Sequence, residues 1–250
     1  PGVARPTPVL LNHVYFAPDA ETYAALTASE FLREAFAVTE VRSTVRADIS
    51  YTGFYLYGER TYFEFLSPGA NAPLPPGSSG LFLGVERDEG IDDVANRLRA
   101  AGLQCGGGPM TRDFAGEPVP WFRLLGLAMP AGRTGLLNLL CMEYVPEFLA
   151  RWHGGLPPKG ASIARSAVLE RYAASLGRHD DRGEALFRDV TAVHLALPEP
   201  ERARVREALQ VLGFVLEPTT DEGTAAWRGP GFRVLVRATD GTARIAGLEL

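Results

Sequence analysis

The order of hydrophobic patterns along the chain constrains its fold more than any other feature of the sequence. The same order, a strand, an amphipathic helix and then two or three more strands, occurs three times. The three units cover residues 1–68, 80–148 and 188–250, with a Pro/Gly/Ser-rich linker after the first unit and a mostly helical connection at 149–187 before the third. We therefore predict an α+β fold built from repeated βαβββ modules.

Residue periodicity defines the predicted elements of each unit. The first unit has a helix at 21–36 and strands at 9–17, 38–47, 52–59 and 61–67. The second unit has a helix at 91–101 and strands at 80–85, 118–127 and 136–144. The third unit has a helix at 200–212 and strands near 190–197, 214–218, 223–228, 231–236 and 243–250.

A βαβββ module carries its helix on one face of its sheet, so the other face stays open until a second module covers it. Pairing two modules makes a curved, open-barrel cleft. With three modules, one pair closes in this way, and the remaining module packs beside it or pairs across a homodimer interface. The pattern leaves both placements open.

Composition and charge narrow the class of partner to small molecules. The hydrophobic content of 46% suits well-filled cores, and a net charge of −5 without a basic cluster argues against a nucleic-acid partner. No apolar run approaches the roughly 20 residues that span a bilayer, and the start lacks a signal-peptide pattern. We therefore expect no membrane partner and a cytoplasmic location. Cys105 and Cys141 lack metal-site spacing and are predicted to be buried free thiols.

Two polar side chains stand alone in otherwise apolar strands of the first unit. Strand alternation puts His13 on one face with Leu11 and Tyr15, and it puts Glu64 on one face with Tyr62. An unpaired buried carboxylate costs several kcal/mol, so Glu64 needs a cation, an arginine or strong donors nearby. His13 is a candidate co-ligand of a divalent metal ion.

Each of these side chains also has a structural interpretation that involves no ligand. His13 can be a buried histidine that donates to a neighbouring backbone carbonyl. Glu64 can form an ion pair with Arg42 or Arg46 across the predicted sheet. The sequence leaves these alternatives open.

Two segments of the first unit, 11–16 (LNHVYF) and 58–65 (GERTYFEF), resemble the first module of the vicinal oxygen chelate superfamily, which includes glyoxalase I, extradiol dioxygenases and bleomycin-resistance proteins. In that superfamily an opening "NH" strand and a closing "YLEL"-like strand supply two metal ligands, here His13 and Glu64. In the second unit, 139–144 (LLCMEY) places Glu143 where a further ligand would lie, whereas 81–83 (LFL) offers none. More narrowly, the chain resembles an uncharacterised glyoxalase-like bacterial family with no assigned reaction.

The resemblance implies a small-molecule-processing metalloenzyme. A divalent metal held by His13, Glu64 and Glu143 would act as a Lewis acid on an oxygen-bearing substrate, and Glu64 or Glu143 could serve as the catalytic base. Isomerase, lyase and dioxygenase reactions all stay open. The alternative is a metal-free protein that binds or sequesters a small molecule, as in bleomycin resistance, and the apolar corner at 81–83 favours it.

Further candidates lie outside the predicted ligand set. Tyr62 shares the face of Glu64, and alternation places Trp121 and Arg123 on one face, where they could bind a substrate or only pack between modules. The third unit contains His194 and Glu249. Aligning its proline at 198 with the proline at 18 predicts that His194 faces away from the position equivalent to His13.

Overall fold

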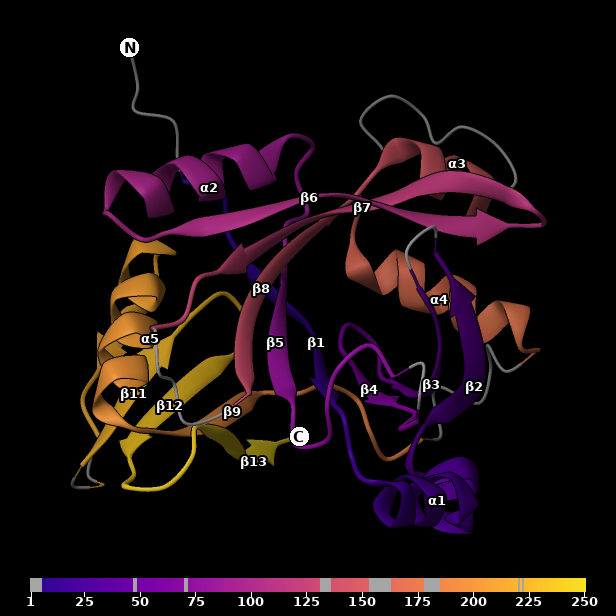
Figure 1. Ribbon diagram of the computed structural model, residues 1–250, viewed down its shortest axis with the longest axis horizontal. Helices are drawn as coiled ribbons and strands as arrows, with labels where there is room; N and C mark the ends of the chain where they lie inside the picture. Colours follow the sequence, from indigo (N-terminus) through magenta and orange to yellow (C-terminus); the bar gives the residue numbers. More distant parts are fainter. Residues whose placement is uncertain are drawn as a thin grey trace.

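The structure is a computed structural model of the 250-residue chain. It describes residues 6–46, 49–69, 72–130, 136–152, 163–177, 185–219, 221 and 223–250. The strands form one sheet of eight and one sheet of five (Figure 1). Among the described helices, none is long and apolar enough to cross a membrane.

The first unit forms one half of the eight-stranded sheet. Its strands are β1 (Leu10–Phe16), β2 (Val38–Val45), β3 (Ser50–Tyr57) and β4 (Tyr62–Leu66), in the order β2-β3-β4-β1 with β1 parallel to β4. The single predicted helix is instead α1 (Ala20–Ala28) followed by a π-helical turn, η1 (Leu32–Phe36). The break occurs at Ser29, whose backbone is extended and whose hydroxyl accepts the N–H of Leu32. A serine that caps the following turn ends the preceding helix.

The second unit forms the other half of this sheet. It comprises β5 (Ser79–Gly84), α2 (Gly90–Ala100), β6 (Cys105–Phe114), β7 (Glu117–Leu127) and β8 (Leu137–Tyr144), with the strand order β5-β8-β7-β6. The sequence did not predict β6, because its run of three glycines at 106–108 has low strand propensity. Pairing with β7 along its length holds β6 in the sheet.

Antiparallel pairing of β1 with β5 joins the two units into one continuous sheet. The sheet curls until its edge strands β2 and β6 come into contact (Figure 1). Side chains from its inner face line a hollow. The predicted pair of βαβββ modules around a curved cleft is therefore confirmed.

Two helices follow the second unit. They are α3 (Pro146–Trp152) and α4 (Arg165–Ser175), and the side chains of α4 pack on the hollow side of the large sheet. The predicted helical connection at 149–187 is helical in these parts, and its stretches 153–162 and 178–184 lie outside the described residues.

The third unit repeats the same topology in the second sheet. It comprises β9 (Ala192–Leu197), α5 (Glu199–Val211), β10 (Val215–Glu217), β11 (Thr224–Arg228), β12 (Arg233–Ala238) and β13 (Arg244–Glu249). Its strand order is β10-β11-β12-β9-β13, with β12 parallel to β9 and β13 antiparallel to it. The strand β13 thus takes the place beside β9 that β5 takes beside β1.

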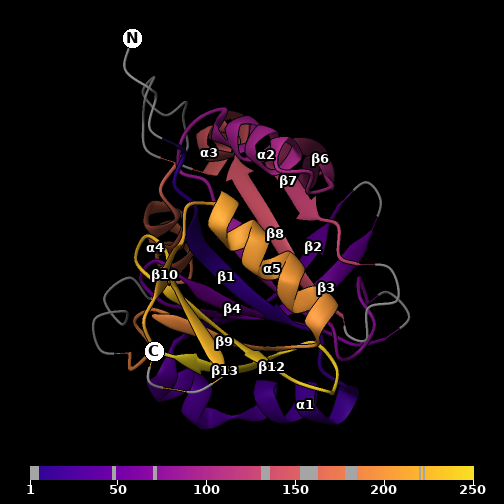
Figure 2. The same ribbon diagram turned by 90° about the vertical axis from the view of Figure 1, so that its left-hand side faces the viewer.

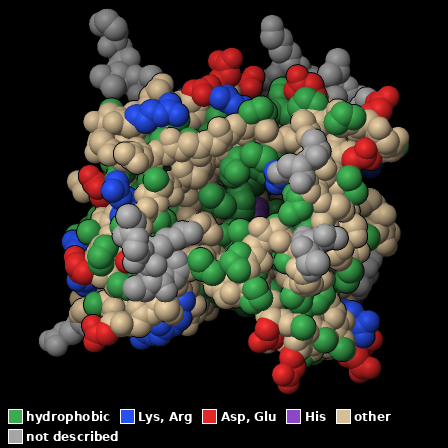
Figure 3. Space-filling view, viewed as in Figure 1, with side chains coloured by type: hydrophobic (Ala, Val, Ile, Leu, Met, Phe, Trp, Pro, Cys, Tyr) green, Lys and Arg blue, Asp and Glu red, His purple; other side chains and the backbone are tan. Residues whose placement is uncertain are grey.

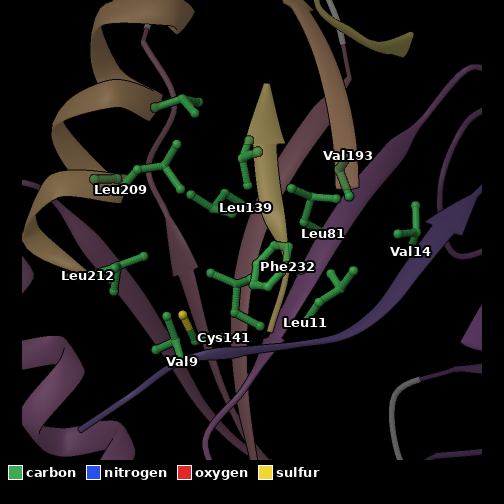
Figure 4. Close-up of a cluster of buried hydrophobic side chains, with 14 of the residues drawn as sticks. Val9, Leu11, Val14, Leu81, Leu139, Cys141, Val193, Leu209, Leu212 and Phe232 are labelled. Atoms are coloured by element: carbon green, nitrogen blue, oxygen red, sulfur yellow. The ribbon is translucent and has the colours of Figure 1, made fainter. Parts of the chain in front are cut away.

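The main hydrophobic core lies between the outer face of the large sheet and the third unit. Helix α5 packs beside α2 across this face (Figure 2). Figure 4 shows side chains from the three units meeting there, among them Val14, Leu81, Cys141, Val193 and Leu209. The third module therefore packs against the closed pair within the same chain, which is one of the two placements that the sequence left open. Its other face is not covered by any described segment. Cys105 and Cys141 are free thiols, as predicted, but of the buried positions expected for both, Cys141 is buried and Cys105 is only partly buried.

Candidate functional site

A β-bulge in β1 decides which of its side chains reach the hollow. The pairing of β1 with β5 shifts register between Leu11 and His13. Leu11 therefore lies in the main core with Val14, while His13 and Tyr15 face the hollow. The prediction that Leu11 shares the face of His13 is wrong, because the extra residue in the bulge interrupts the alternation.

The imidazole of His13 is held in one orientation by its neighbours. It stacks between the rings of Tyr62 (centroids 4.3 Å apart) and Phe82 (4.2 Å). Its Nδ1 lies 2.9 Å from Oδ1 of Asn12, an oxygen that can only accept, so Nδ1 carries the proton. Burial lowers the pKa of His13 to about 3, and the ring is therefore neutral at pH 7. Its Nε2 is left with a lone pair that can accept a hydrogen bond.

The carboxylate of Glu64 faces this lone pair. Its Oε2 lies 3.6 Å from Nε2 of His13, and its Oε1 accepts a hydrogen bond of 2.8 Å from the hydroxyl of Tyr55. Burial raises the pKa of Glu64, and the Tyr55 hydroxyl and the charge of Arg42 oppose that rise. The structure thus brings together the two side chains that the sequence singled out. Two acceptors that face each other need a proton donor or a cation between them.

The structure does not bring Glu143 to this pair. In β8 the side chains of Met142 and Tyr144 line the hollow, so alternation turns Glu143 to the opposite face. There it accepts the backbone N–H groups of Glu89 (3.2 Å) and Ile91 (2.8 Å). The expected third metal ligand is instead a cap for the N-terminus of α2, and that expectation is corrected.

A second bulge separates Trp121 from Arg123. The pairing of β7 with β6 shifts register at Trp121, which lines the hollow. Arg123 faces the other way and forms two hydrogen bonds, of 2.9 and 2.5 Å, with the carboxylate of Asp92 on α2. The prediction that both side chains share one face is wrong for the same reason as in β1. Of the three predicted substrate-binding residues, Tyr62 and Trp121 lie at the hollow.

Aromatic side chains form most of the wall around His13 and Glu64. The inner cavity has a volume of about 100 Å³. Figure 3 shows the hollow with apolar walls and a histidine at its floor. The tyrosines of this wall come from three strands, β3, β4 and β8, and from α4, and they are Tyr51, Tyr55, Tyr57, Tyr62, Tyr144 and Tyr172. Sequence reasoning found only Tyr62 among them, although the alternate spacing of Tyr55 and Tyr57 in a predicted strand was a usable signal.

A buried arginine completes the wall. The guanidinium of Arg42 lies between the rings of Tyr55 (4.2 Å) and Tyr172 (4.6 Å), which is cation–π geometry. Its Nη1 donates to Oε2 of Glu40 (2.8 Å) and to the hydroxyl of Tyr57 (3.0 Å). Within the described residues, the ion pair of Arg42 is therefore with Glu40, and not with Glu64 as the structural interpretation of Glu64 allowed.

The donor set can be tested against the divalent metal that the superfamily implies. Two ligands of one tetrahedral ion at ~2.1 Å lie about 3.4 Å apart, close to the 3.6 Å between His13 and Glu64. However, no group of three His, Cys, Asp or Glu side chains with metal-binding geometry occurs in the described part of the chain. On the side of the second unit the hollow is lined by Phe82 and Met142. Two ligands fall short of the three that a metal site with an open position takes from the protein, so the described residues do not fit a resident metal.

The third unit holds a second histidine and glutamate pair. His194 lies on the face of β9 opposite to Val193, which is buried in the main core. The predicted orientation of His194 is wrong, because the alignment of the two prolines is off by one residue. The proline at 198 is itself the N-cap of α5, whereas the N-cap of α1 is Asp19, one residue after the proline at 18. His194 thus faces away from its helix, as His13 does, and its Nε2 lies 3.0 Å from Oε1 of Glu249.

Comparison with known proteins supports the fold. A model described as "Family of unknown function (DUF5829)" matches residues 11–248. A hypothetical protein from Staphylococcus aureus has a TM-score of 0.57 at 10% identity, over 95% of this chain and 88% of that one. No curated protein matches.

Two further solved structures are more distant. They are an extradiol ring-cleaving dioxygenase from B. fuscum (TM-score 0.49, 13% identity) and an Mn(II)-bound glyoxalase from Novosphingobium aromaticivorans (0.46, 12%). This chain is covered over 99% and 96% of its length, but it spans only 59% and 64% of theirs. The topology described above confirms the predicted fold of repeated βαβββ modules.

Proposed function

Given that the chain belongs to the DUF5829 family of unknown function, we propose that it binds a small, hydroxyl-bearing aromatic molecule in the hollow without a resident metal ion. The observation that carries this proposal is the pair of acceptors, Nε2 of His13 and Oε2 of Glu64, which face each other across 3.6 Å. A ligand hydroxyl beside both atoms donates a hydrogen bond to Nε2 of His13. Oε2 of Glu64 is an acceptor while the carboxyl is ionised, and once the carboxyl is protonated it donates a hydrogen bond to the ligand oxygen.

The surroundings favour an aromatic ligand. Rings on several sides offer stacked and edge-on contacts, which add about 0.5–1.5 kcal/mol per pair beyond the burial of area. The raised pKa of Glu64 and the neutral state of His13 also allow the pair to hold or pass a proton at the ligand oxygen. The proposal therefore covers binding, and proton transfer is the chemistry that this pair can add.

Calorimetric titration with phenol tests the proposal. His13→Phe keeps the ring between Tyr62 and Phe82 but removes the acceptor, and Glu64→Leu removes the carboxyl at similar size. We expect each to weaken binding at least about tenfold, the effect of losing one hydrogen bond of about 1.4 kcal/mol. His194→Phe and Glu249→Leu are the matched controls on the open face of the third unit and should leave the affinity unchanged. Equal affinity in all variants contradicts the proposal.

A metalloenzyme is the second candidate, because the spacing of His13 and Glu64 suits two ligands of one ion. The test is to load the protein with Mn²⁺, Zn²⁺ or Co²⁺, dialyse it and measure the bound metal. We expect substoichiometric metal that His13→Phe does not change. If the wild type retains one equivalent of metal and His13→Phe does not, the metal-free proposal is contradicted and this candidate is supported.

A further inference from the structure

A second, larger cavity adjoins the inner one. It has a volume of about 290 Å³, compared with about 100 Å³ for the inner cavity. The two cavities share five wall residues, Arg46, Tyr51, Glu64, Phe82 and Leu124. Small-molecule sites measure roughly 300–1,000 Å³, so the inner cavity alone is below that range and the two chambers together reach it.

The outer chamber differs from the inner one in chemistry. Its own walls are mostly apolar, with Leu66, Pro73, Leu74 and Leu140 among them. Its one amide side chain, Asn138, is already occupied, since it donates to the hydroxyl of Tyr15 (2.6 Å) and to the carbonyl of Leu136 (3.3 Å). The outer chamber therefore offers burial of apolar area more than specific polar contacts.

Part of this chamber is formed by the segment between the first two units. Pro73 and Leu74 belong to the Pro/Gly/Ser-rich stretch, and Leu74 packs against the small cluster of Tyr15 and Leu66. Leu66 itself is only 5% exposed. A connection that the sequence treated as a linker thus contributes side chains to the wall of the site.

We infer that the ligand is amphiphilic, with its hydroxyl head between His13 and Glu64 and an alkyl tail in the outer chamber. This inference rests on the proposed function. Glu64 lies in the wall of both chambers, so a head group bound to its carboxyl has the outer chamber directly beside it. The apolar lining then selects an alkyl-substituted hydroxyl compound over a small polar one.

Titration with a series of alkylphenols separates the contribution of the alkyl tail to binding from that of the hydroxyl head. The probes are phenol, 4-ethylphenol and 4-butylphenol, titrated into the full chain by calorimetry. We expect the Kd to fall about fourfold for each added methylene in the wild type, because each buried methylene contributes about 0.8 kcal/mol. Leu74→Asn and Leu140→Asn should flatten this slope and leave the Kd of phenol unchanged. Leu235→Asn, on the open face of the third unit, is the matched control and should keep the wild-type slope.

The outcomes separate the two proposals. If the wild type binds phenol but its Kd does not change with the length of the alkyl chain, the inference of an amphiphilic ligand is overturned and the proposed function is kept. A steep slope that neither Leu74→Asn nor Leu140→Asn reduces also overturns the inference, because the tail then lies elsewhere. No binding of any member of the series overturns both.

Discussion

The first and third units carry the same pair of residue types in two different surroundings. His13 and Glu64 lie 3.6 Å apart with side chains only 4% and 11% exposed, whereas His194 and Glu249 lie 3.0 Å apart with side chains 37% and 41% exposed. Both histidines point away from the helix of their own module. The difference arises because the second unit covers the first, while no described part of the chain covers the corresponding face of the third unit.

The comparison shows that burial, and not residue type, determines the pKa shifts and the hydrogen bonding of each pair. Around His13, two stacked rings and the loss of water lower the pKa of the imidazole to about 3. The side chain of Glu249 stays partly exposed, and hydrogen bonds from His194 and Arg233 lower the pKa of its carboxyl instead. The first pair leaves two acceptors that need a donor, whereas the second pair is partly exposed and hydrogen-bonded, with Arg233 as a further partner of Glu249.

The largest expected difference between the two pairs is in folding stability. His13→Ala should cost about 2–4 kcal/mol in urea unfolding, because it leaves a cavity between Tyr62 and Phe82 and removes the partner of the buried Asn12 amide. His194→Ala should cost less than about 1 kcal/mol. Similar losses for both variants would show that the two sites are equally buried in solution.

The second largest expected difference between the two pairs is in the pH dependence of folding stability. The folded pKa of His13 is about 3, below its unfolded value of 6.5, so the unfolded chain binds the extra proton between these values. Stability should therefore fall by about 2 kcal/mol between pH 8 and pH 5 because of this residue alone. Glu64, with its raised pKa, acts in the opposite direction.

The contribution of His13 can be isolated in a Glu64→Leu background. Urea unfolding of Glu64→Leu is compared with that of the double variant that adds His13→Phe, at pH 8 and at pH 5. We expect the loss at low pH only where His13 is present. A double variant that loses the same amount contradicts the assignment, and adding His194→Phe to the same background is the matched comparison.

A smaller effect should come from the hydroxyl that supports Glu64. Tyr55→Phe removes the donor to Oε1 and raises the pKa of Glu64 further, since that hydrogen bond favours the charged form. We expect a loss of about 1.5 kcal/mol at pH 8 that shrinks at low pH, where Glu64 is protonated. Tyr62→Phe, in the same wall, is the control. A loss that does not depend on pH would mean that Tyr55 acts by packing alone.

The smallest effect should come from the exposed pair. Glu249→Gln weakens the hydrogen bond with His194 and removes the ion pair with Arg233, whose side chains are 37% and 46% exposed. Exposed ion pairs contribute about 0–1 kcal/mol and are screened by salt. Unfolding at low and high salt should show a small loss that vanishes at high salt. A loss of several kcal/mol would contradict the open face of the third unit.

Much of the fold followed from local patterns, and the failures have a common cause. The period of two in the strands indicated His13, Glu64 and Tyr62, which all reach the hollow. The period failed where a partner strand imposes a bulge, at Leu11 in β1 and at Trp121 in β7. A bulge depends on the register of two strands, so one strand's own residues do not show it.

By itself, the sequence determined that the chain forms three helix-backed modules and that a histidine and a glutamate from the first of them face one hollow, because side-chain direction alternates along a strand wherever no bulge interrupts it. The tertiary structure alone decided that Glu143 caps α2, that α4 and the linker wall the site, and that the pair of the first unit is buried while that of the third is not. Burial comes from contacts between segments far apart in the chain, and it is burial that sets the protonation of His13 and Glu64.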